Sequence, residues 1–102
     1  MNDLKIFESE AFGKIRMLEK DGEPWFVAAD VCRALELDRT QSRRLDDDEK
    51  GVCSIPTPGG PQETSVVNEP GLYALVLGSR KPEAKAFKRW ITHEVIPSIH
   101  RH

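Results

Sequence analysis

The sequence of residues 65–102, SVVNEPGLYALVLGSRKPEAKAFKRWITHEVIPSIHRH, holds the clearest structural signals of the chain. Asn68 is a favoured N-cap residue, and Pro70 suits the first turn of a helix. We therefore expect a short apolar helix over residues 71–77. Gly78 is expected to end this helix in the left-handed conformation, which glycine adopts without a steric penalty.

The second helix of this stretch carries an apolar face and a basic flank side by side. It is expected to begin at Pro82 and to run to residue 96, with Pro97 interrupting or ending it. At about 100° per residue, one broad face is apolar and should pack into the core: Ala84, Phe87, Trp90, Ile91 and Val95. The adjacent flank is basic and is formed by Lys85, Lys88 and Arg89. Two more basic residues, Arg80 and Lys81, lie just before the helix and could extend this patch. This flank is either an ordinary solvated surface or a binding surface, and its scarcity of acidic neighbours favours the second interpretation.

The charge of the chain is unevenly distributed. The whole sequence of 102 residues has a net charge of −2. Residues 70–102 hold six basic and two acidic side chains, so this third is locally +4 and the remainder is −6. A strongly basic nucleic-acid-binding protein has a different overall composition, but a local patch of this kind can attract phosphate or an acidic protein surface.

The first two thirds of the chain alternate between extended and helical patterns. A short strand is expected at residues 4–7, followed by a hairpin over 14–27 that turns at Asp21 and Gly22. Helices are expected over 28–35 and 39–45, and a second hairpin is formed by 52–55 and 64–67 around a loop rich in proline and glycine. We therefore expect one domain over residues 1–102 with an α+β fold. Two β-hairpins should form a small antiparallel sheet packed with about four helices.

The segment from Val31 to Leu45, VCRALELDRTQSRRL, is similar to a helix-turn-helix. Ala34 is small enough for two helices to cross, and Asp38 can cap the second helix. Four polar side chains of that helix could then reach phosphates or base edges: Arg39, Gln41, Arg43 and Arg44. Glu36 and Ser42 depart from the pattern, because the turn usually has glycine and the second helix an apolar anchor. The alternative is a helical pair packed on the sheet, with its arginines paired to the acids of residues 46–49.

The residue patterns of most enzymes and metal sites are absent from the sequence. Cys32 and Cys53 form no CxxC pair and are expected to be buried, reduced thiols. There is no phosphate-binding glycine loop, nucleophile motif or calcium loop, and His93, His100 and His102 are expected to be exposed and inert. We therefore expect no enzyme activity, cofactor or metal. No apolar run is long enough to span a bilayer, so no membrane association is expected.

Several stretches together resemble the N-terminal domain of the BRO family, which occurs in prophage antirepressor-like proteins and in proteins of large DNA viruses. They are PWFVAADVCRALEL, LDDDEKG, TPGGPQE and NEPGLYALVLGSRKPEAKAFKRWITHEVIPSI, and the resemblance extends from Ile6 to Ile99. It implies a DNA-associated regulatory domain, usually followed by a variable second domain, with no established catalytic residues. The matching basic positions are those of the flank described above, whereas residues 36–42 are the least similar segment.

Three hypotheses follow for a protein of the bacterial host cytoplasm. In the first, the basic flank and the arginines of residues 39–44 bind duplex DNA. In the second, the protein is an antirepressor that contacts a repressor protein, which the slightly negative net charge favours. In the third, the domain forms a homodimer and leaves recognition to another domain.

Overall fold

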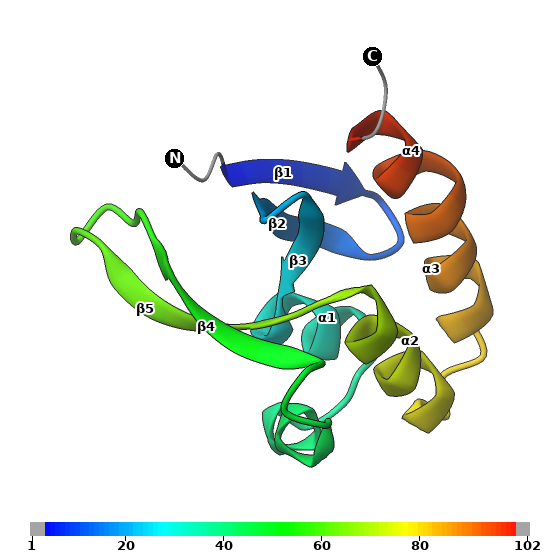
Figure 1. The fold of residues 1–102 in the computed structure, drawn as a ribbon. Helices are drawn as coiled ribbons and strands as arrows, with labels where there is room; N and C mark the ends of the chain where they lie inside the picture. The colour runs from blue at the N-terminus through cyan, green and yellow to red at the C-terminus, as the bar shows by residue number, and fades with distance from the viewer. Residues whose placement is uncertain (1–3, 100–102) are drawn as a thin grey trace.

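The computed structural model describes residues 4–99 and contains one five-stranded antiparallel sheet (Figure 1). The strand order is β1-β2-β3-β5-β4, with bounds β1 Leu4–Ser9, β2 Gly13–Lys20, β3 Glu23–Val27, β4 Lys50–Ile55 and β5 Gln62–Val67. The two expected hairpins are present, and β1 adds a third strand to the first of them. The hairpins are joined only where Phe26 and Val27 pair with Val67 and Val66. The β4–β5 hairpin therefore diverges from the other strands and projects from the body.

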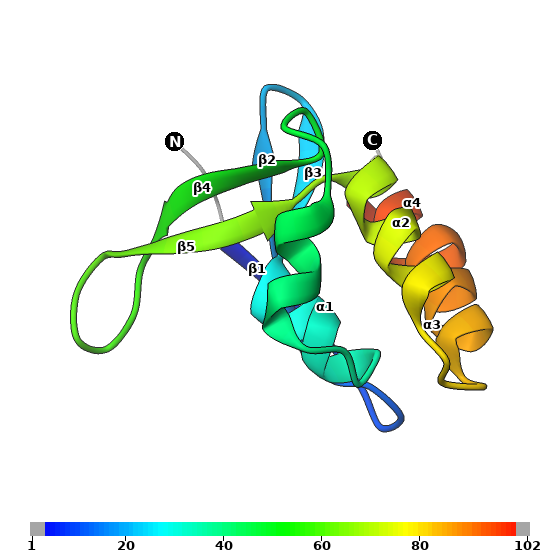
Figure 2. The same ribbon diagram turned by 90° about the horizontal axis from the view of Figure 1, so that it is seen from below.

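Helices cover one side of the sheet (Figures 1 and 2). Their bounds are α1 Ala28–Ala34, the 3-10 helix η1 Arg39–Arg44, α2 Glu69–Gly78, α3 Ala84–Trp90, the π-helical turn η2 Ile91–Val95, and α4 Ile96–Ile99. The last three follow one another without a break and form one rod. The described residues thus contain three helical rods, and the fourth expected helix, over residues 39–45, is a 3-10 helix rather than an α-helix.

Two apolar clusters occupy opposite faces of the sheet because successive residues of a strand point in opposite directions. Met17, Phe26 and Val67 belong to the main core, which lies between the sheet and helices α1, α2 and α3. Their neighbours in sequence, Leu18, Val27 and Val66, belong to a smaller cluster on the other face, together with Cys53 and Ile55 of β4. All five residues of the apolar face expected for the last helix pack in or against the main core.

Helix α1 closes the gap that opens where the two halves of the sheet diverge. β2 pairs with β3 only from Met17 to Lys20, which leaves the start of β2 without a strand on that side. Asp30, only 3% exposed, accepts the main-chain N–H of Arg16 at 2.9 Å and two guanidinium hydrogen bonds from the same residue at 2.9 and 3.0 Å. Arg33 donates to the carbonyl oxygen of Lys14 and lies 3.6 Å from Asp30. Side chains of α1 therefore take the place of a neighbouring strand.

The expected cap of α2 is confirmed. The Oδ1 atom of Asn68 accepts the N–H of Gly71 at 3.0 Å, and its Nδ2 atom donates to the carbonyl oxygen of Asp48 at 2.8 Å. A Cβ atom on Gly71 would stand 2.5 Å from the carbonyl oxygen of Glu49, so only glycine fits there. The expectation for Gly78 was wrong in one respect. The helix ends at this residue, but its φ is not positive and the space around it is open.

The other backbone signals agree with the structure in part. Asp21 and Gly22 have φ values of 54° and 78°, as the expected two-residue hairpin turn requires. Pro97 is the second residue of α4, inside the last helical rod and just after the π-helical turn. Ile96, between them, donates its N–H to the carbonyl oxygen of Ile91, five residues back. Proline lacks an N–H group and its ring crowds the preceding turn. The wider π-helical turn accommodates the proline, so the rod continues through it.

Candidate nucleic-acid interface

The basic flank of α3 faces solvent. Lys85, Lys88 and Arg89 are exposed, as is Arg80 in the loop before the helix. Within residues 4–99, no acidic side chain lies within ion-pair distance of any of these four. The positive charge of the flank is therefore not neutralised by the folded domain itself.

Aromatic packing fixes the position of this flank. The rings of Phe12, in the β1–β2 turn, and Phe87, on α3, meet edge to face with centroids 5.1 Å apart. Trp90 stacks at 6.1 Å from Phe12 and is partly buried against the main core, so it is a packing residue, as expected, rather than an exposed platform. With one face of α3 anchored in this way, the basic side chains must point away from the core.

Lys81 was expected to extend the basic patch, but the structure gives it a different position. Its side chain is only 19% exposed, and its Nζ atom donates to the carbonyl oxygen of Ala34 at 3.2 Å. The same ammonium group lies 3.7 Å from Glu36 and 6.0 Å from the ring centroid of Phe12. A cation at this place complements the negative end of α1. We therefore conclude that Lys81 stabilises the folded domain and is not part of the exposed basic surface.

Lys88 is linked to α2 through a tyrosine. Its Nζ atom lies 5.5 Å from the ring centroid of Tyr73, whose hydroxyl group donates to Glu69 at 2.9 Å. Burial, the hydrogen bond to Glu69 and the charge of Glu69 raise the pKa of Tyr73 to about 12. The tyrosine therefore remains a neutral hydrogen-bond donor throughout the physiological range, and its ring restrains the lysine by a cation–π contact.

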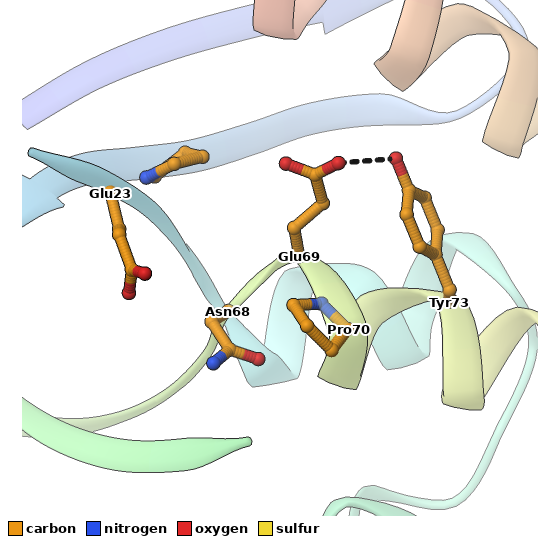
Figure 3. A pocket seen from close by; sticks show the side chains of 6 residues that line it. Glu23, Asn68, Glu69, Pro70 and Tyr73 are labelled. Atoms are coloured by element: carbon orange, nitrogen blue, oxygen red, sulfur yellow. Dashed lines mark hydrogen bonds between the residues drawn. The ribbon is translucent and has the colours of Figure 1, made fainter. Parts of the chain in front are cut away.

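A hollow of about 270 Å³ adjoins this tyrosine, and sequence reasoning did not foresee it (Figure 3). Glu69 and Tyr73 project from α2 on the same side and are joined by their hydrogen bond. The lining residues are Glu23, Pro24, Asn68, Glu69, Pro70 and Tyr73. The charged side chains among them are acidic, so the hollow does not suit phosphate.

The second group of expected binding residues lies on the other side of α2 from α3 (Figure 2). Arg43 and Arg44 are exposed at the end of η1, while the side chain of Arg39 lies outside what the structure describes, as do residues 100–102. The carboxylate of Asp38 caps η1 and accepts the N–H of Thr40 at 2.9 Å, which lowers the pKa of Asp38. Contrary to the alternative interpretation, the described residues show no ion pair between Arg43 or Arg44 and the acids of residues 46–49.

The helix-turn-helix interpretation is not supported by this geometry. Its second element is a six-residue 3-10 helix, which is shorter and more tightly wound than the α-helix that reads a major groove. The turn alone matches the motif, because Glu36 has a φ of 55°, the left-handed conformation for which the motif usually has glycine. Arg43 instead lines two adjoining hollows of about 380 and 370 Å³ between η1 and the β4–β5 hairpin.

Across residues 4–99, no three histidine, cysteine or acidic side chains come together in a way that could hold a metal ion. The helices of this range are too short or too polar to cross a membrane. Cys32 and Cys53 are both buried and are not joined in a disulfide.

Comparison with known proteins identifies the family. The family model for the BRO family N-terminal domain matches residues 14–97. An uncharacterized protein of Haemophilus influenzae is 38% identical over 88 residues, which cover 83% of this chain and 44% of that relative. The chain thus spans less than half of the relative's length, and no solved structure matches it. Because the family model matches most of its length, the chain belongs to the BRO family and contains its N-terminal domain.

Proposed function

We propose that this domain binds duplex DNA through the basic flank of α3, as part of a phage-type, antirepressor-like transcriptional regulator. The exposed, unneutralised bases Arg80, Lys85, Lys88 and Arg89 carry the proposal. Family membership supports a regulatory setting of this kind. The domain is proposed as a binding module of the bacterial cytoplasm, without catalytic activity.

The spacing of these side chains suits a phosphate backbone. Lys85, Lys88 and Arg89 lie within one turn of α3, so they are separated along its axis by no more than about 6 Å. Duplex DNA carries one negative charge per about 1.7 Å of its axis, so several phosphates lie within reach of such a cluster. Contacts of this type give affinity without reading base sequence.

The salt dependence of DNA binding tests the proposal quantitatively. If four side chains each contact a phosphate, the slope of log K against log salt should be about −3.6. Affinity should then fall about 100-fold between about 50 and 200 mM salt. Fluorescence anisotropy with a labelled duplex measures this directly. Failure to bind at low salt, or binding that is indifferent to salt, would rule the proposal out.

Matched charge variants locate the interface. The double variant Lys85→Ala/Arg89→Ala should reduce the slope to about −1.8, because two phosphate contacts are lost. Lys88 is left in place because it also packs on Tyr73. The control variant Lys5→Ala/Lys14→Ala removes the same charge from exposed positions on β1 and β2 and should leave the slope almost unchanged. If Arg43→Ala/Arg44→Ala has the largest effect instead, the interface lies at η1 and the assignment to α3 is wrong.

One observation favours contact with a repressor protein as a second candidate function. Leu77 on α2 is 86% exposed and lies one helical turn after Tyr73, whose ring contacts Lys88 of the basic flank. DNA phosphates offer no partner for a leucine side chain. An acidic protein surface with an apolar pocket would suit both features. Under this alternative, Leu77→Ser should abolish capture of a repressor from host lysate and leave DNA affinity unchanged. If the Leu77→Ser variant captures the repressor as well as the unmodified protein does, the alternative is wrong.

A further inference from the structure

The two edges of the sheet are protected to very different degrees. β1 and β4 are the outermost strands. β1 carries the exposed charges Lys5 and Glu8, and charges on an edge strand discourage pairing with another chain. β4, by contrast, carries no charge after Lys50, and Val52 in its middle is 57% exposed. Figure 1 shows no other element alongside the outer edge of β4 over most of its length.

The direction of the hydrogen-bonding groups of β4 follows from its pairing with β5. Asn68, directly after β5, donates its N–H to the carbonyl oxygen of Glu49, directly before β4. In an antiparallel pair, alternate residues direct their main-chain groups toward the partner strand. Residues 49, 51, 53 and 55 therefore face β5, and Lys50, Val52 and Ser54 present their N–H and C=O groups outward. These three residues form a ready template for one more strand.

We propose that β4 pairs antiparallel with β4 of a second copy of this chain, which joins the two sheets into one. Only registers that pair outward-facing residues satisfy the hydrogen bonds. The register centred on Val52 places this exposed valine opposite its own copy and Lys50 opposite Ser54 of the second chain. β-Branched side chains opposite one another stabilise antiparallel pairs, and no like charges are opposed in this register.

The absence of charged residues in most of β4 favours a second copy of this chain over an unrelated protein as its partner. A strand evolved to bind one foreign partner commonly uses charges to select it and to exclude others. β4 is uncharged from Gly51 to Ile55, so it is complementary to itself under a two-fold axis. The basic flank of α3 lies on the far side of the domain from β4, so pairing leaves it uncovered (Figures 1 and 2).

Sedimentation equilibrium over a concentration series tests the pairing. The unmodified chain should shift from monomer toward dimer as its concentration rises. Val52→Lys should weaken the dimer by about tenfold or more, because two lysines would face each other across the two-fold axis. Ser54→Pro should abolish the dimer, because it removes an outward N–H group but no bond within the sheet. Melting temperatures of both variants confirm that they are folded.

The edge strand β1 supplies a matched control. Ile6 is 58% exposed on β1, so Ile6→Lys introduces the same charge in place of a β-branched residue at an equally exposed position of the other edge. It should leave dimerisation unchanged. In hydrogen exchange, the amides of Val52 and Ser54 should become slower at high concentration. A monomer at all concentrations, equal weakening by Val52→Lys and Ile6→Lys, or exchange that does not depend on concentration would each overturn the proposal. None of these results bears on DNA binding by α3.

Discussion

Replacing Asp30 with asparagine should destabilise the domain more than any exposed charge change. The carboxylate is 3% exposed and accepts three hydrogen bonds from Arg16, one from the main chain and two from the guanidinium group. Asparagine has the same size but a single acceptor oxygen. Its NH₂ group is only a donor, so it cannot accept a hydrogen bond from the N–H groups of Arg16 that it would face.

The expected loss can be bounded from the geometry. A hydrogen bond to a charged group is worth about 1.5–3 kcal/mol, and removing one partner of a buried ion pair costs about 3–5 kcal/mol. The side chain of Arg16 is 35% exposed, so water recovers part of its lost interaction. We expect Asp30→Asn to lower the free energy of unfolding by about 3 kcal/mol, a large fraction of the 5–15 kcal/mol typical of a domain. The melting temperature should fall by roughly 12–24 °C.

Urea and thermal unfolding followed by circular dichroism measure this loss. Arg33→Gln is the comparison, because Arg33 contacts the same carboxylate at 3.6 Å and donates to the carbonyl oxygen of Lys14, but its side chain is 57% exposed. That variant should lose no more than about 1 kcal/mol. If Asp30→Asn is no worse than Arg33→Gln, the buried carboxylate of Asp30 does not hold the start of β2. The explanation of how α1 closes the sheet would then be wrong.

Substitutions of two glycines and the titration of Tyr73 give further tests of the structure. Gly71→Ala should destabilise the domain by more than about 2 kcal/mol, because the new Cβ atom meets a main-chain oxygen at 2.5 Å, whereas Gly78→Ala should stabilise it by about 0.5 kcal/mol; thermal melts of both variants provide the comparison. The pKa of Tyr73, the chain's single tyrosine, should be about 12 by ultraviolet titration, and Glu69→Gln should lower it only partly because burial is the larger cause. Because the folded pKa of Tyr73 lies above its ordinary value of 10.0, the contribution of Tyr73 to stability should be constant below about pH 10 and should be lost as the pH rises toward 12.

Sequence reasoning was most successful where a signal and its effect lie close together in the chain. The cap at Asn68, the turn at Asp21 and Gly22, and the apolar face of α3 each depend on residues within about one helical turn or one hairpin turn. These predictions were confirmed. The family resemblance was also confirmed, over residues 14–97. The left-handed conformation expected for Gly78 was wrong, because Ser79 ends the helix with an extended backbone and needs no positive φ before it.

Sequence reasoning failed at residues whose partners lie far away in the chain. In the sequence, Lys81 and Lys85 are both lysines of the same basic stretch. In the structure, however, Lys81 donates to the carbonyl oxygen of Ala34, 47 residues earlier. Glu36 was noted only as a poor turn residue, but its position also brings it to Lys81. Sequence periodicity does not predict such long-range contacts. A lysine that is held by distant residues therefore cannot be distinguished in the sequence from a lysine that is exposed.

The sequence by itself determined the α+β class, the apolar and basic sides of the last helix, and the family, because local backbone preferences and periodicity act over a few residues. The tertiary structure alone decided which bases remain free, how α1 replaces a strand beside β2, and that β4 has an unprotected edge. The physical reason is that solvent exposure and pairing belong to the packed arrangement of all the elements. A lysine or a strand edge becomes available to a partner only if no distant part of the same chain has already taken it.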